Sequence, residues 1–114
     1  MATSATRYKS EQAAKVYLEM RGFHVIEQNY RRSRYEIDII AKKENVVYFV
    51  EVQYRISSAY DNAYEYLSPS QLCKLQSAAE SWLDEYKWHG NYNLSTIEIS
   101  ENTYSILGFI ENIL

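Results

Sequence analysis

The chain contains, at residues 35–53, the sequence YEIDIIAKKENVVYFVEVQ. Two apolar segments, residues 35–41 and 46–53, are rich in isoleucine, valine and aromatic residues, which favour extended strands. The polar residues 43–45 between them predict a short hairpin turn, so the two strands should be neighbours in one sheet. The second strand is almost continuously apolar, which is typical of a central strand covered on both faces.

The flanking segments predict two helices. Apolar residues recur at helical spacing over residues 7–21, and Gly22 is a natural residue to end that helix. The clearest helix start is Ser68-Pro69-Ser70-Gln71, which offers an N-cap serine, a proline at the first helical position and a capping-box glutamine. Helical spacing of apolar residues continues from there, and Gly90 ends the segment.

Three further strands complete the pattern, at residues 23–30, 96–100 and 104–109, with polar turn residues 31–34 after the first of them. Residues 56–66 are predicted to form a loop. The element order is therefore α-β-β-β-α-β-β, and the expected fold class is α/β, a mixed sheet flanked by helices. A length of 114 residues and an apolar content of 46% fit one domain, residues 1–114, with its own core.

Acidic side chains interrupt the two apolar strands of the hairpin. Side chains alternate across a strand, so Glu36 and Asp38 share one face of the first strand, and Glu51 and Gln53 share one face of the second. Acids are rare inside apolar strands unless they are paired or bind a metal. Because Asp38 and Glu51 can converge, and Mg²⁺ needs only one or two carboxylates besides water and phosphate, we predict an Mg²⁺ or Mn²⁺ site with these two ligands. The alternative is a pair of solvated or salt-bridged acids.

Glu11 is a candidate third acid. It shares a face of the first helix with Ala14 and Leu18, which should point inward. The alternative role is that of an acid favoured by the positive end of the helix dipole.

The charge of the chain argues against a general affinity for nucleic acid, because the formal net charge is −3. Basic residues nevertheless gather locally at Arg31, Arg32 and Arg34, followed by Lys42, Lys43 and Arg55. Any nucleic acid would have to be held by this local patch, with metal ions assisting. The alternative for the arginine cluster is a solvated turn.

The rest of the composition bounds location and partners. No apolar run approaches the roughly 18–20 residues of a membrane span, and residues 1–10 show no secretory signal. We therefore expect a cytoplasmic protein without membrane association. The 12 tyrosines pack in the interior or on the surface by default, and exposed ones could serve a homodimer interface.

At residues 35–41 and 49–55 the sequence resembles the central signature of the YraN-like family. That family belongs to the restriction-endonuclease-like superfamily, whose motif is an aspartate, a short spacer and then Glu-x-Lys. The resemblance extends to residues 10–14, to residues 22–31 and to the second helix and last two strands, so it covers nearly the whole chain. It implies a restriction-endonuclease-like fold, with Asp38 and Glu51 as metal ligands and Glu11 and Glu36 as further acids of the catalytic site.

The sequence also departs from the motif of that family. Gln53 stands where the resemblance expects the catalytic lysine, which orients the attacking water and stabilises charge on the phosphate. Gln71 stands where the family has another basic residue, although the capping box explains this glutamine equally well. Lys74, one helical turn later, could restore a cation. Ser10 and Tyr35 replace glycines.

Three functions remain open on these grounds. The first is a divalent-metal-dependent nuclease acting on DNA, including structured or branched forms. The second is a catalytically weakened or inactive relative that binds nucleic acid or a protein partner, which Gln53 and the acidic net charge favour. The third is a small interaction domain whose acids only stabilise the sheet.

Overall fold

The computed structural model describes residues 4–32, 34–55 and 67–114, and the expected loop at 56–66 lies outside them. Along the described chain the elements are α1 (Ser4–Met20), β1 (His24–Arg32), β2 (Tyr35–Lys43), β3 (Val46–Arg55), α2 (Pro69–Glu85), β4 (Asn91–Ser100) and β5 (Ile106–Ile110). The predicted order α-β-β-β-α-β-β is confirmed.

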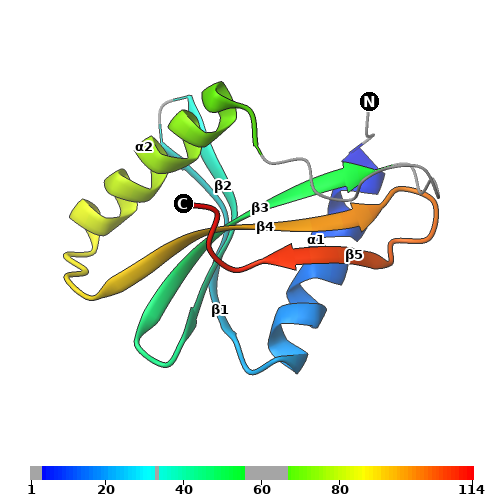
Figure 1. The fold of residues 1–114 in the computed structure, drawn as a ribbon, viewed down its shortest axis with the longest axis horizontal. Helices are drawn as coiled ribbons and strands as arrows, with labels where there is room; N and C mark the ends of the chain where they lie inside the picture. Colours follow the sequence, from blue (N-terminus) through cyan, green and yellow to red (C-terminus); the bar gives the residue numbers. More distant parts are fainter. Residues whose placement is uncertain (1–3, 33, 56–66) are drawn as a thin grey trace.

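The five strands form one mixed sheet in the order β1-β2-β3-β4-β5 (Figure 1). Strands β1, β2 and β3 are antiparallel neighbours, β3 and β4 are parallel, and β5 returns antiparallel to β4. A parallel pair needs a long connection, and α2 lies within the one that joins β3 to β4. Strand β3 is the middle strand, as its apolar sequence predicts.

A helix packs on each face of the sheet. Trp82 of α2 is buried in a core cluster with Phe49 of β3, and Leu18 of α1 is buried in a second cluster with Val50. Phe49 and Val50 are consecutive, so they point to opposite faces of the strand. The fold therefore has three layers, helix–sheet–helix, and each face of the central strand is covered.

Two element boundaries differ from the sequence prediction because of long-range pairing. Strand β4 begins at Asn91, not near residue 96, and it pairs with β3 from Val46↔Asn91 to Arg55↔Ser100. The polar residues at its start look unlike a strand, but pairing with the central strand overrides local preference. Strand β1 likewise runs through Arg32 into the predicted turn, because Arg32 pairs with Tyr35.

The two ends of the sequence were also placed imperfectly. Helix α1 begins at Ser4, three residues before the predicted start at Arg7. Strand β5 begins at Ile106, since Tyr104 adopts a left-handed backbone with φ of 57° that a strand cannot continue.

Three local turn and cap signals were predicted correctly, but the predicted end of the second helix was wrong, because α2 ends at Glu85 and not at Gly90. Ser68 caps α2 by accepting a hydrogen bond from the Gln71 N–H, and the Gln71 side chain accepts one from the Ser68 N–H, so the predicted capping box is confirmed. Gly22 ends α1 with φ of 89°. In the β2–β3 turn, Glu44 and Asn45 have φ of 50° and 65°, the left-handed pair typical of a two-residue hairpin turn.

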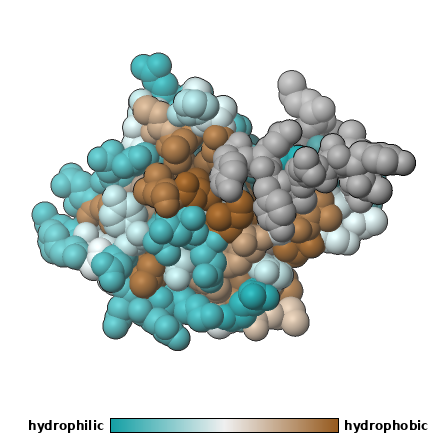
Figure 2. Space-filling view, in the orientation of Figure 1, coloured by the Kyte–Doolittle hydropathy of each residue, from teal (hydrophilic) through white to brown (hydrophobic). Residues whose placement is uncertain are grey.

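The surface of the molecule is mixed. Figure 2 shows hydrophilic residues around the margin of one face and a group of hydrophobic residues near its centre. Neither α1 nor α2 has the length and apolar character that crossing a membrane would require.

Phe49 tests the central position of β3. It is fully buried and makes edge-to-face contacts with Trp82 and Tyr92. We expect Phe49→Ala to lower the free energy of unfolding by about 3–5 kcal/mol, because the loss of buried area leaves a cavity. Met20→Ala, at a side chain that is 82% exposed, should change it by less than about 0.5 kcal/mol. Urea unfolding of both variants measures the difference, and equal effects would contradict the three-layer packing.

Candidate functional site

The candidate site lies where the backbone pairing between β2 and β3 ends. Their paired register runs from Lys43↔Val46 to Ile39↔Val50 and ends there. The next residue of β2 is Asp38, whose Oδ2 accepts a hydrogen bond of 2.8 Å from the Val52 N–H. A carboxylate therefore takes the place of a backbone carbonyl as the partner of this amide, which keeps the buried N–H satisfied. Only 5% of Asp38 is exposed.

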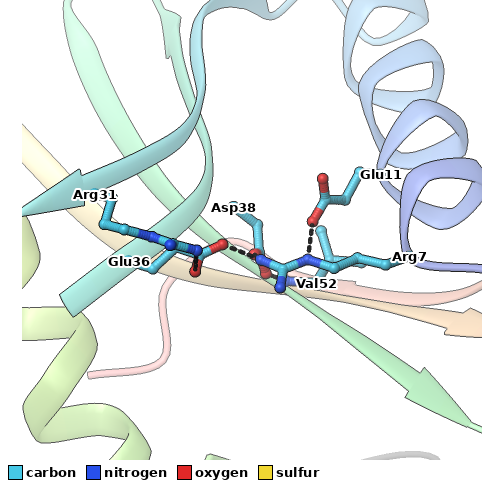
Figure 3. Close-up of polar contacts among 6 residues, drawn as sticks. All are labelled: Arg7, Glu11, Arg31, Glu36, Asp38 and Val52. Carbon is cyan, nitrogen blue, oxygen red and sulfur yellow. Dashed lines mark hydrogen bonds and ion pairs between the residues drawn. The ribbon is translucent and has the colours of Figure 1, made fainter. Parts of the chain in front are cut away.

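Arg7 of α1 reaches across to the same carboxylate (Figure 3). Its Nη2 lies 3.3 Å from Asp38 Oδ1 and also donates to Glu36. Its Nε donates to Glu11 Oε2 at 2.9 Å, within α1 itself. One guanidinium thus binds three carboxylates from two elements. We call Glu11, Glu36, Asp38 and the neighbouring Glu51 the acid cluster.

Glu51 is the member of the acid cluster whose pKa is raised most. Burial raises its pKa far above the ordinary range, and a hydrogen bond to Asp38 and the negative charges of Asp38 and Glu36 raise it further. Arg7 opposes this rise and does not overcome it. The environment of Glu51 therefore favours the protonated form of its carboxyl group, through burial first and then through its acidic neighbours.

Glu11, also in the acid cluster, and the nearby Tyr54 have raised pKa values as well. Burial raises the pKa of Glu11, while its hydrogen bond with Arg7 lowers it. The pKa of Tyr54 is raised by burial first and then by the charges of Asp38 and Glu11, so its phenol stays protonated. A protonated phenol in this position can donate a hydrogen bond to a bound anion.

Three members of the acid cluster, Glu36, Asp38 and Glu51, line a cleft of about 310 Å³, whereas Glu11 is not among its lining residues. The lining residues are Arg7, Arg34, Glu36, Asp38, Glu51, Val52, Tyr54, Gln71, Lys74 and Leu75. Carboxyl groups come from β2 and β3, whereas Lys74 comes from α2 and Arg34 from the segment before β2. Opposite charges therefore line one cleft.

The five basic residues predicted to bind nucleic acid are placed in different environments. Arg34 and Lys74 line the cleft. Arg31 is exposed and donates to Glu36 at 2.8 Å. Arg32 makes a two-pronged ion pair with Glu85, at 3.0 and 2.7 Å, and so ties β1 to α2. The side chain of Arg55 is only 13% exposed and lies 3.1 Å from Glu98.

Gln53 lies beside the buried ion pair of Arg55 and Glu98. It stands opposite Glu98 in the parallel register of β3 and β4, and Glu98 is 2% exposed. The Oε1 atom of Gln53 is buried and accepts no hydrogen bond from any residue that the structure describes. Gln53, at the position where a lysine was expected, is therefore a neutral amide that is not among the residues lining the cleft.

The donor set of the cleft fits a hard divalent cation. Asp38 and Glu51 offer carboxylate oxygens side by side, and Mg²⁺ typically takes one or two such groups and fills its remaining positions with water and phosphate. No group of three His, Cys, Asp or Glu side chains suited to a metal was found in the described ranges.

Comparison with known proteins gives the family. Residues 10–104 match the model of Uncharacterised protein family UPF0102. The chain belongs to this family. A UPF0102 protein of Cytophaga hutchinsonii is 34% identical over 90 residues, which are 79% of this chain and 80% of the relative. A UPF0102 protein of Campylobacter fetus is 33% identical over 106 residues, which are 93% of this chain and 90% of the relative.

The UPF0102 match includes every member of the acid cluster but begins three residues after Arg7. Arg7 and Tyr54 are the two cleft residues with polar side chains that sequence reasoning missed. The spacing of Arg7 and Glu11, four residues apart on a helix, could have indicated the ion pair between them. Nothing local distinguishes Tyr54 from the other tyrosines.

Glu51 should make the metal-free protein less stable as pH rises. Its folded pKa lies above its unfolded value, so the folded state binds more protons and stability falls from about pH 5 upward. In EDTA, we expect Glu51→Gln to raise Tm at pH 8 and to change it little at pH 4.5. About 1 kcal/mol of relief corresponds to roughly 4–8 °C.

Glu85→Gln is the matched control for this experiment. The pKa of Glu85 is lowered by its hydrogen bond with Arg32, so this carboxylate adds stability at neutral pH and loses it in acid. The control should lower Tm at pH 8, the opposite direction. A fall in Tm with Glu51→Gln at pH 8 would contradict the assigned environment of Glu51.

Proposed function

We propose that this domain is a divalent-metal-dependent nuclease that hydrolyses phosphodiester bonds, with DNA as the substrate. The observation that supports this proposal is the cleft in which the carboxyl groups of Asp38 and Glu51 face Arg34 and Lys74. Carboxylates can hold a metal ion, and cations beside them can neutralise phosphate. This combination is what phosphoryl chemistry requires, since such catalysis is mostly positioning and charge stabilisation.

Each residue has a role in this proposal. Asp38 and Glu51 would hold Mg²⁺ or Mn²⁺, which when bound would supply a Lewis acid and a more acidic water. Lys74 and Arg34 would bind phosphate oxygens on the open side of the cleft. Tyr54 would donate a hydrogen bond from its protonated phenol. Cytoplasmic location, expected from the sequence, belongs to the same proposal.

Placement in the restriction-endonuclease-like superfamily is part of the proposal as well. It is supported by the element order, by the mixed sheet, and by an aspartate and a glutamate on neighbouring strands at the mouth of one cleft. Glu11 and Glu36 join these acids through Arg7. Gln53 could still accept or donate a hydrogen bond to water, although it brings no charge.

Binding without cleavage is the second candidate, and Gln53 favours it. Loss of one charge-stabilising group lowers rates on the order of 10²–10³-fold. The nearest cation along β3, Arg55, is already paired with Glu98. In this alternative the cleft still binds nucleic acid, or a protein partner with acidic groups, but turnover is slow or absent.

Cleavage assays distinguish the two candidates. The purified chain is incubated with single-stranded, duplex and branched DNA and with RNA, in Mg²⁺, Mn²⁺ or EDTA. We expect metal-dependent cleavage of DNA that Asp38→Asn reduces at least about 100-fold, because an amide is a poor ligand for a hard cation. The asparagine can still accept the hydrogen bond from Val52, which keeps the strands in place.

Gln53→Lys is the companion variant, and it should raise the rate by about tenfold or more if charge is what the site lacks. Cleavage by Gln53→Lys alone would establish the second candidate, a site disabled at one residue. No cleavage and no binding of DNA or RNA by any variant would refute the nuclease and the nucleic-acid-binding form of the second candidate, and would favour a domain that binds a protein partner.

A substitution of Lys74 tests whether the basic residues that line the cleft contact DNA. Each phosphate contact adds about one unit to the slope of log affinity against log salt. We expect Lys74→Gln to weaken DNA binding at all sequences and to lower this slope by about 1. Lys87→Gln removes the same charge from an exposed lysine just beyond the other end of α2 and should leave the slope unchanged. Fluorescence anisotropy titrations over a range of salt concentrations measure both, and equal slopes would exclude Lys74 as a contact.

A further inference from the structure

Arg7 lies among the carboxylates of the candidate metal site (Figure 3). It contacts Glu11 of its own helix and both acids of β2, Glu36 and Asp38. Among the residues that the structure describes, Asp38 forms an ion pair with this guanidinium. Arg7 therefore neutralises, within the protein itself, the group that a metal ion would use.

The two oxygens of Asp38 are occupied differently. Oδ2 accepts the hydrogen bond from the Val52 N–H, which fixes the carboxylate in the sheet. Oδ1 faces Arg7, at 3.3 Å from Nη2. A cation bound at Oδ1 would therefore lie within a few ångströms of the guanidinium. Two positive charges at that separation repel strongly, so the two cations must compete for this oxygen.

The Arg7 side chain has space to move into the cleft if a metal ion displaces it from Asp38. Its side chain is 43% exposed and lines the cleft that also contains Arg34 and Lys74. The Nε bond to Glu11 can hold the stem, while the terminal nitrogens turn into the cleft. A guanidinium presents its donors in a planar fork that matches the oxygens of a phosphate group.

We propose that Arg7 is an exchangeable counter-ion, which neutralises Asp38 and Glu36 until a divalent cation binds and whose released guanidinium then binds a phosphate group in the cleft. The phosphate step rests on the proposed function, whereas the competition with metal does not require any activity. Arg7 would thereby supply a positive charge to a site in which Gln53 supplies none.

Mn²⁺ binding to the full chain tests the competition directly, by calorimetry or by the loss of the free-ion electron paramagnetic resonance signal. We expect Arg7→Gln to bind Mn²⁺ on the order of tenfold more tightly than the unmodified chain, because a repelling charge is removed. Arg7→Lys keeps the charge and should bind within about threefold of the unmodified chain. Arg21→Gln lowers the net charge equally at the residue after α1, outside the acid cluster, and should also change little.

The outcomes separate this proposal from the proposed function. Equal or weaker Mn²⁺ binding by Arg7→Gln, with binding by the unmodified chain intact, overturns the counter-ion and leaves the nuclease standing. Binding by Arg7→Gln alone supports the counter-ion strongly. No Mn²⁺ binding by any variant overturns both. Thermal unfolding in EDTA confirms that each variant folds, and Arg7→Met, which also removes the charge, replaces Arg7→Gln if that variant does not fold.

DNA binding tests the released guanidinium. In Ca²⁺, Arg7→Gln should lower the salt slope for a short DNA duplex by about 1, the effect of one lost phosphate contact. In EDTA the same substitution should leave the slope unchanged, because Arg7 is then held by the acids. Equal slopes in Ca²⁺ for the unmodified chain and Arg7→Gln, or no DNA binding in Ca²⁺, would overturn the phosphate contact.

Discussion

The hydrogen bond from the Val52 N–H to the Asp38 carboxylate is the interaction on which the rest of the site depends. It lies where the pairing of β2 with β3 ends, so one strand can turn away without leaving a buried amide unsatisfied. The same bond keeps an ionisable group almost fully buried in the sheet. A buried carboxylate needs compensating charge, and Arg7 supplies it from the first helix. The Asp38 carboxylate therefore completes the strand pairing and also carries the buried charge that Arg7 balances.

Much of the fold could be predicted from the sequence because its signals are local. The capping box of Ser68 and Gln71, the left-handed Gly22 and the β2–β3 hairpin each depend on residues within a few positions. The start of β4 could not be predicted, since Asn91 is extended only because it pairs with Val46, 45 positions earlier in the chain. Errors of this kind fall where pairing with a distant strand, and not side-chain preference, decides the backbone.

The candidate site divides in the same way. Asp38 and Glu51 could be singled out because acids in apolar strands are unusual, and the structure places both at one cleft. The ion-pair partners of the basic residues could not be predicted from the sequence, because these pairs form across large sequence separations. Arg32 meets Glu85 of α2, and Arg55 meets Glu98 of β4. Arg7 was missed for a further reason: its importance lies in partners on another element, Glu36 and Asp38.

The two walls of the cleft belong to different layers, and this separation has an evolutionary consequence. Asp38 is embedded in the sheet, where a side chain that cannot accept the hydrogen bond from the Val52 N–H would leave a buried amide unsatisfied. Lys74 is exposed on the first turns of α2, and substitutions at exposed helix positions that make no cap typically change stability by less than about 0.5 kcal/mol. The capping box fixes the direction of these turns while leaving Lys74 free to vary. Lys74 can therefore be replaced at little cost to folding, whereas Asp38 is constrained by the strand geometry that it maintains.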